Sequence, residues 1–170
     1  RGLDAVILNP TAVIGPVDPR PSRMGGVLHA LAKGRMPLLV DGGFDWVDVR
    51  DVVSAALNAV AVGRIGQRYL LSGTWASIAD VAGLVDDASG RRHRRWVLPV
   101  GLAKAFAPVV GVAARLAGSP PVFTEESLAI VAEGNRNIRH DLATRELQYY
   151  PRPLAETIRD TIEWFVNENT

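Results

Sequence analysis

The sequence has 170 residues, of which 48% are hydrophobic and 22% charged, with a formal net charge of +1. A chain of this length fits one domain and is too apolar to be intrinsically disordered. The near-neutral charge argues against binding to nucleic acid or to a membrane surface, and the absence of cysteine excludes disulfides and cysteine-ligated zinc and is compatible with a reducing cytoplasm.

Short apolar strands separated by helices dominate the first hundred residues. Residues 5–8 form a β-branched run that ends at Asn9-Pro10, where proline cannot donate a ladder hydrogen bond, so we expect a buried strand followed by a Pro- and Gly-rich loop over residues 11–22. Ligands of open α/β sheets sit on loops of this kind. Further short strands are expected at residues 38–40, 46–49, 69–71 and 96–98.

Helices are expected where apolar residues recur every three to four positions. Ser22 caps one that ends at Gly34, Gly63 ends the helix over residues 51–62, and Ser77 with Asp80 forms a capping box for residues 77–89. Later helices are expected over residues 100–117, 124–132, 142–147 and 154–167. The order predicts an α/β fold with a doubly wound, Rossmann-type parallel sheet and a mostly helical cap.

Residues for nucleotide binding and proton transfer are missing from this sequence. No strand is followed by a glycine-rich phosphate-binding turn, and no tyrosine has a lysine four residues later. His29, His93 and His140 have no metal-ligand spacing, so no metal site is expected. We interpret the basic run of residues 91–95 as a solvated loop; a phosphate-binding patch is the alternative. The apolar run of residues 99–117 is interrupted by two charges and does not predict a membrane span.

Four segments, in order, resemble the C-terminal half of extended short-chain dehydrogenases/reductases. They are LDAVILNPTAVIGPVD, FDWVDVRDVVSAALNAV, GQRYLLSGTWASIADVAGLVDDASG and HDLATRELQYYPRPLAETIRDTIEWF, which together cover nearly the whole chain. The nearest subset is that of the dihydroflavonol reductases and 3β-hydroxysteroid dehydrogenases. Gln148 departs from the pattern, which has glycine there.

The resemblance implies a division of the chain and a set of site residues. Residues 1–98 would be the C-terminal part of the Rossmann-type sheet, lacking its N-terminal nucleotide-binding strands, and residues 99–170 the helical substrate-binding cap. The cofactor, NAD or NADP, would contact Asn9, Pro10, Thr11 and Val13 in the full-length protein, and the substrate would contact Met24, Phe44 and Trp46. No catalytic residue is expected in this chain, because the family's Tyr-x-x-x-Lys set belongs to upstream sequence. Asp51 is interpreted as a residue matched to a helix dipole.

We therefore expect the substrate-binding half of an oxidoreductase that acts on a carbonyl or alcohol of an apolar small molecule. This half alone is expected to be inactive and marginally stable, and the complete protein could form a homodimer. One alternative is a nucleotide-sugar epimerase or dehydratase, in which Arg23, Arg35 and Arg139 could clamp a diphosphate. Another is a non-catalytic binding or regulatory module that has kept the fold.

Overall fold

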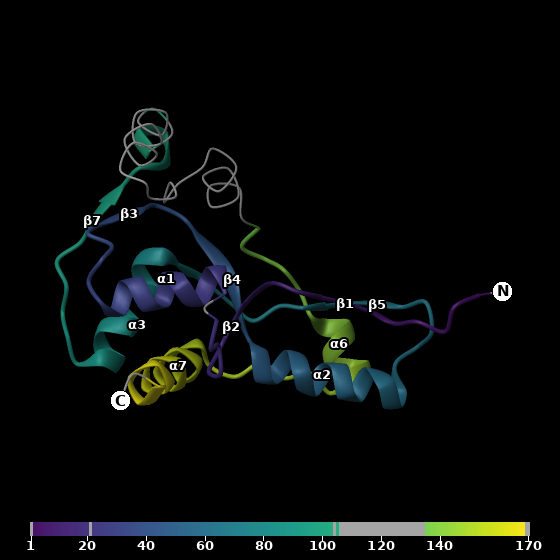
Figure 1. Cartoon of the computed structure of the whole chain (residues 1–170). Coiled ribbons are helices and arrows are strands. Elements are labelled where there is room, and N and C mark those ends of the chain that lie inside the picture. Colours follow the sequence, from purple (N-terminus) through teal and green to yellow (C-terminus); the bar gives the residue numbers. More distant parts are fainter. Residues whose placement is uncertain (1, 21, 104, 106–134, 169–170) are drawn as a thin grey trace.

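The computed structural model describes residues 2–20, 22–103, 105 and 135–168, in which strands and helices alternate as expected for an α/β fold (Figure 1). The strands are β1 (Ile7–Pro10), β2 (Ala12–Ile14), β3 (Leu38–Val40), β4 (Gly43–Asp48), β5 (Arg68–Leu71), β6 (Thr74–Ser77) and β7 (Trp96–Leu98). The helices are α1 (Arg23–Ala32), α2 (Val49–Val62), α3 (Ile78–Ser89), α6 (Asp141–Leu147) and α7 (Leu154–Glu168). Among the described residues, no helix combines the length and apolar composition needed to cross a bilayer.

Three of the four strand pairings are parallel, which agrees with the predicted fold class. β1 pairs with β5, β2 with β4, and β3 with β7, whereas β4 and β6 pair antiparallel. The antiparallel pair was not predicted, because a strand was expected over residues 69–71 and none between it and the helix over residues 77–89, where β6 lies.

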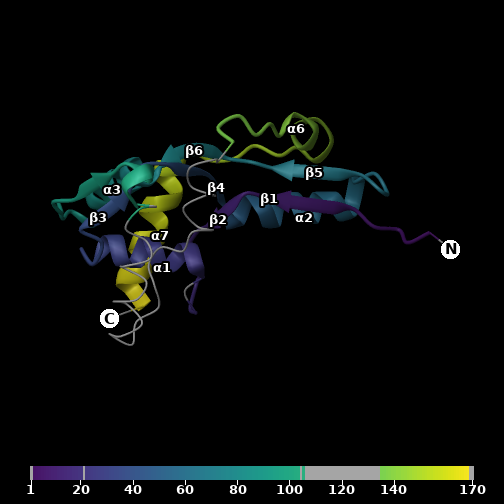
Figure 2. The same cartoon turned by 90° about the horizontal axis from the view of Figure 1, so that it is seen from above.

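The sheet branches where the N-terminal strand changes partner. Residues 7–10 pair with β5, but after the single residue Thr11 the chain continues as β2 and pairs with β4. In the same way, β5 pairs with β1, and after Ser72-Gly73 the chain continues as β6 and pairs with β4. β4 therefore lies between β2 and β6, while β1 and β5 lie side by side beyond the branch (Figure 2).

Two hydrophobic cores lie on either side of this branch, because neighbouring side chains of β4 point to opposite faces. Trp46 enters a core formed with α1, α3 and α7, and Val47 enters a core formed with β5, α2 and α6. Figure 1 shows the same grouping, with α2 and α6 along β1 and β5. The first core includes Leu28, Leu31, Val81, Val85, Ile158 and Ile162, and the second includes Ala55, Ala59, Tyr69, Leu71 and Leu147.

The helix ends confirm the capping signals read from the sequence. The Ser22 side chain accepts from the Gly25 amide at the start of α1. Ser77 and Asp80 form the complete capping box of α3, and Gly90 ends that helix in the left-handed conformation. Gly63 caps the C-terminus of α2.

Two expectations about the N-terminal strand are wrong. The strand is not buried: Ile7, Asn9 and Pro10 are exposed, because within the described residues β1 has a neighbouring strand on one edge only. The loop expected over residues 11–22 begins with β2 instead, since pairing with β4 outweighs the weak local signal.

Part of the expected helical cap lies outside the described residues, namely the expected helix over residues 124–132 and most of the one over residues 100–117. The division of the chain at residue 98 therefore stays a prediction. The described helices α6 and α7 both share cores with residues before that point.

Candidate functional site

The branch of the sheet is held together by the carboxylate of Asp45. Its Oδ1 accepts a hydrogen bond from the Thr11 hydroxyl at 2.7 Å and one from the Gly73 amide at 2.7 Å. Thr11 lies between β1 and β2, and Gly73 lies between β5 and β6, so one carboxylate oxygen joins both of these connecting segments to β4. Asp45 is only 7% exposed, and a buried carboxylate needs donors of this kind.

The two donors are themselves fixed in position. The Thr11 amide donates to the Leu71 carbonyl at 3.2 Å, which extends the β1–β5 pairing by one residue. Gly73 passes so close to β4 that a side chain there would overlap the carbonyl oxygen of Trp46. The branch thus places a loop, a buried carboxylate and a tight glycine turn at the carboxyl ends of β1 and β5, where α/β proteins bind ligands.

The four residues predicted to contact a cofactor lie along the outer edge of β1 and β2. Asn9 is exposed and its side chain makes no hydrogen bond within the described residues, and Pro10 is exposed beside it. Thr11 is committed to Asp45 and Leu71, and Val13 packs partly against the second core. Both strands are terminal in their sheets, so the backbone groups on the outer edge have no strand partner in the part of the chain that the structure describes. A contact with a cofactor stays a prediction for all four.

The three residues predicted to contact substrate come together in the first core. Phe44 and Trp46 make an edge-to-face contact with ring centroids 5.5 Å apart, and Met24 and Phe44 pack partly buried against the core. Trp46 is 2% exposed and its indole donates to the Ala76 carbonyl at 3.0 Å. Trp46 therefore packs as a core residue in this structure, whereas Phe44 and Met24 keep accessible surface. Their roles toward substrate stay predictions.

A second polar cluster covers the branch from the side of α6, and sequence reasoning missed it. The Ser72 hydroxyl is fully buried and lies 2.8 Å from His140 Nδ1, and Tyr149 donates to the Ser72 carbonyl at 2.9 Å. Burial, followed by the charges of nearby aspartates, raises the pKa of Tyr149 above its ordinary value, so this phenol is poorly suited to proton transfer.

Asp45 was also missed, although the sequence held a signal for it. In GFDWVD, period-two alternation sets Asp45 on the same face as Val47, the face opposite Phe44 and Trp46. An acidic residue between buried neighbours on a strand calls for a hydrogen-bond partner. The identity of its partners, Thr11 and Gly73, depends on residues 34 and 28 positions away.

An ion-pair network anchors α7 to the start of α2. Asp48 accepts from Arg50, which also contacts Asp160 of α7 at 2.8 Å, and Asp51 binds Arg152 at 2.8 Å. Burial raises the pKa of Asp48, but hydrogen bonds from the Arg50 side chain and backbone outweigh that effect and leave the pKa below its ordinary value. Asp51 lies in the first turn of α2 as predicted, and its pairing with Arg152 adds a structural role.

The basic run of residues 91–95 is a loop, as predicted, but it is not solvated throughout. The Arg95 side chain is 8% exposed and binds Asp86 through two nitrogens, at 2.7 and 2.8 Å. His93 also contacts Asp86. Burial raises the pKa of Asp86, but hydrogen bonds from Arg95 and His93 outweigh it and lower the pKa to about 2. No group of three potential metal ligands occurs among the described residues.

A curated relative matches almost the whole chain. It is the "Sterol demethylase protein B" of Methylococcus capsulatus, which is 33% identical over 167 residues. The match covers 97% of this chain and 51% of the relative, so the chain spans about half the length of the curated relative it matches. No protein-family model matches the sequence.

Solved structures share the fold over a similar span. The crystal structure of gox2253 is 31% identical, with a TM-score of 0.78 over 96% of this chain and 49% of that one. The structure of PA4631, described as a nucleoside-diphosphate-sugar epimerase from Pseudomonas aeruginosa, is 27% identical, with a TM-score of 0.77 over 98% of this chain and 49% of that one. A UDP-glucuronic acid 4-epimerase from Bacillus cereus, solved with UDP-glucuronic acid and NAD, shares the fold at 16% identity, with a TM-score of 0.66 over 98% of this chain and 46% of that one.

Proposed function

Because this chain belongs to the extended short-chain dehydrogenases/reductases of the NAD-dependent epimerase/dehydratase superfamily and matches their C-terminal half, we propose that it is the substrate-binding half of an NAD(P)-dependent oxidoreductase. The complete enzyme transfers a hydride between the cofactor and a carbonyl or alcohol carbon of an apolar small molecule. One observation carries the proposal: the hydrogen bond from Thr11 to Asp45 ties the loop proposed to contact the cofactor to the strand that carries Phe44. A cofactor and a substrate must meet at such a junction for hydride transfer.

The proposed cofactor contacts use the free outer edge of residues 7–14. NAD(P) supplies the hydride donor or acceptor when bound. The Asn9 side chain and the outer-edge backbone groups of β1 and β2, which have no strand partner among the described residues, are suited to hold a carboxamide, which needs one donor and one acceptor. The same edge and the exposed face of β1 are suited to packing against the nucleotide-binding part of a longer protein.

An apolar substrate fits the described residues better than a nucleotide sugar does. Arg23 is the first residue of the ten-residue helix α1 and Arg35 follows its C-terminal end, so the length of the helix, about 15 Å at a rise of ~1.5 Å per residue, separates their backbones and does not favour a clamp on one diphosphate. Arg139 is paired with Asp141 at 2.7 Å. Phe44 and Met24 offer apolar surface instead. The name of the Methylococcus relative, which refers to a sterol, points in the same direction.

Nucleotide-sugar epimerisation is the second candidate, because PA4631 is described as such an epimerase and is 27% identical. A non-catalytic binding module is the third. All three readings assign no catalytic residue to this chain, since none of its tyrosines has a lysine four residues later and Tyr149 has a raised pKa. The family resemblance assigns proton transfer to an upstream Tyr and Lys.

The decisive experiment compares this chain with the protein extended by its upstream coding sequence. Each is incubated with NADH or NADPH and with a panel of steroidal and aromatic ketones or UDP-sugars. We expect the extended protein to oxidise the cofactor with an apolar ketone and this chain alone to be inactive. Turnover of UDP-sugars only would establish epimerisation, turnover by this chain alone would contradict the assignment of the catalytic groups, and cofactor binding without turnover would indicate the module.

A pair of variants tests the proposed substrate wall in the extended protein. Phe44→Arg should lower kcat/KM for the ketone by roughly tenfold or more, because it puts a charge where apolar surface is proposed, while Phe44→Leu should stay within about threefold of the parent. Equal effects of the two substitutions would remove Phe44 from the substrate site.

A further inference from the structure

A hollow of about 390 Å³ opens between α1, α3 and α7, on a different part of the molecule from the sheet branch. This volume lies within the range of small-molecule sites. None of the residues proposed to contact cofactor or substrate lines it. The lining residues are His29, Ala32, Lys33, Ser89, Arg91, Ile162, Phe165 and Val166.

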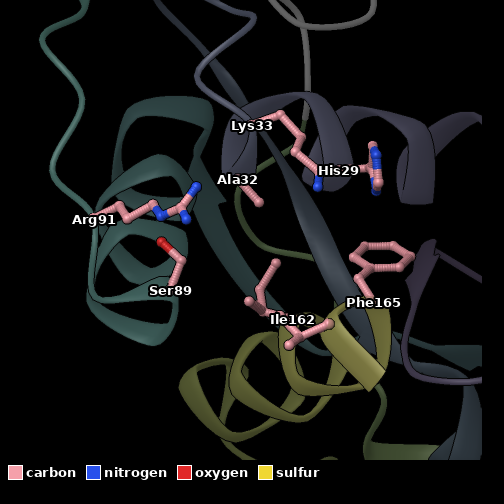
Figure 3. A pocket seen from close by; sticks show the side chains of 8 residues that line it. His29, Ala32, Lys33, Ser89, Arg91, Ile162 and Phe165 are labelled. Atoms are coloured by element: carbon pink, nitrogen blue, oxygen red, sulfur yellow. The ribbon is translucent and has the colours of Figure 1, made fainter. Parts of the chain in front are cut away.

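Three basic side chains converge on this hollow. Figure 3 shows Lys33 and His29 of the α1 segment and Arg91, just after α3, directing their nitrogens into the space above Ile162 and Phe165. Within the described residues, neither the Lys33 ammonium nor the Arg91 guanidinium forms an ion pair or hydrogen bond. Among the described residues, no carboxylate side chain lines the hollow.

Helix dipoles account for only part of this arrangement. Lys33 caps α1 and Arg91 follows the end of α3, and basic residues are favoured at helix C-termini. That preference would be met equally well by side chains extending into solvent in different directions. It does not require two cations that have no ion pair among the described residues, one after each helix, to face the same hollow.

The base of the hollow is apolar. Ile162 and Phe165 belong to the first core, and Ala32 packs against it. The His29 ring meets Phe165 edge-to-face with ring centroids 5.3 Å apart, which continues the apolar base toward the basic rim. An occupant that matches both parts needs a negative group and an apolar body.

We propose that this hollow binds an amphipathic organic anion, namely a carboxylate carried on an aliphatic chain or ring. The carboxylate lies between Lys33 and Arg91, and the apolar part rests on Ile162 and Phe165. Glu163 lines a neighbouring hollow that shares Ser89, Ile162 and Val166 with this one, but it is not among the described residues that line the proposed site. The site is separate from the cofactor and substrate residues of the proposed function.

Octanoate is the probe, and 1-octanol and acetate are matched controls that keep only the chain or only the charge. Binding is measured on the 170-residue chain by calorimetry and by NMR chemical-shift changes. We expect octanoate to bind at least tenfold more tightly than either control, with the largest shift changes at Lys33, Arg91 and Ile162. Binding of octanol as tight as that of octanoate, or shift changes elsewhere, would overturn the proposal.

A double variant supplies the second test. Lys33→Gln with Arg91→Gln should weaken octanoate binding at least tenfold, whereas the matched pair Arg35→Gln with Arg92→Gln removes the same charge from exposed positions outside the lining and should change it less than threefold. The side chains at all four positions are exposed, so both variants should fold like the parent. Equal weakening by the two pairs would mean that net charge, and not this site, attracts the anion.

Discussion

Replacing Asp45 by alanine should destabilise the protein by about 2–5 kcal/mol. The substitution removes the shared acceptor of the Thr11 hydroxyl and the Gly73 amide at a site where the parent carboxylate is 7% exposed, and leaves the hydroxyl only its long contact with the Leu71 carbonyl at 3.4 Å. A donor that loses its partner costs roughly 1–3 kcal/mol, and two half-buried donors are affected here. Since the net stability of a domain is about 5–15 kcal/mol, the loss is large. Asp45→Asn keeps an acceptor oxygen and should cost less than about 1.5 kcal/mol.

Urea unfolding followed by tryptophan fluorescence provides the measurement, because Trp46 adjoins Asp45 and Trp75 lies opposite it in the β4–β6 register. Thr11→Val should cost about 1 kcal/mol, and the double variant with Asp45→Ala should cost at least about 1 kcal/mol less than the sum of the two, since the unpaired hydroxyl is then gone. The reasoning is refuted if Asp45→Ala changes stability by less than about 0.5 kcal/mol at an unchanged dependence on urea, or if the two substitutions are simply additive.

Two further predictions concern α3 and its surroundings. Asp86 has a pKa of about 2 against an ordinary 3.8, so its contribution to the free energy of unfolding, about 2 kcal/mol, is present above about pH 4 and is lost as the pH falls toward 2. Asp86→Asn should remove that contribution at neutral pH and flatten the decline in thermal stability between pH 4 and 2. An unchanged dependence of thermal stability on acid pH would contradict the pairing with Arg95. Ser77→Ala removes half of the capping box and should lower the free energy of unfolding in urea by about 1 kcal/mol. As a control, replacing the exposed Ser54 inside α2 by alanine should change it by less than about 0.5 kcal/mol, and equal effects would show that the Ser77 cap does not stabilise α3.

The helices of the described chain could be predicted from local sequence because their signals are local. Apolar spacing marked the buried faces, and Ser22, Ser77 and Gly63 marked the ends where the structure has them. A cap bonds to amides only two or three residues away, so no distant contact is needed to recognise it.

The strands were predicted less completely because pairing decides them. β3 and β7 were correct to the residue, but β2 and β6 were missed. Each has three or four residues, is separated from the preceding strand by only one or two residues and becomes a strand only because β4 lies beside it. Propensity over so short a run is weak against tertiary context.

By itself the sequence determined the α/β class, the helix boundaries, the parallel character of most strand pairs and the resemblance that identified the family, since these depend on composition, periodicity and ordered motifs. Only the tertiary structure decided that the N-terminal strand changes partner at Thr11, that Asp45 joins the two connecting segments to β4, and that Lys33 and Arg91 face one hollow. Those features join residues that lie 28 to 61 positions apart, and local sequence carries no information on which distant strand, donor or cation will meet them.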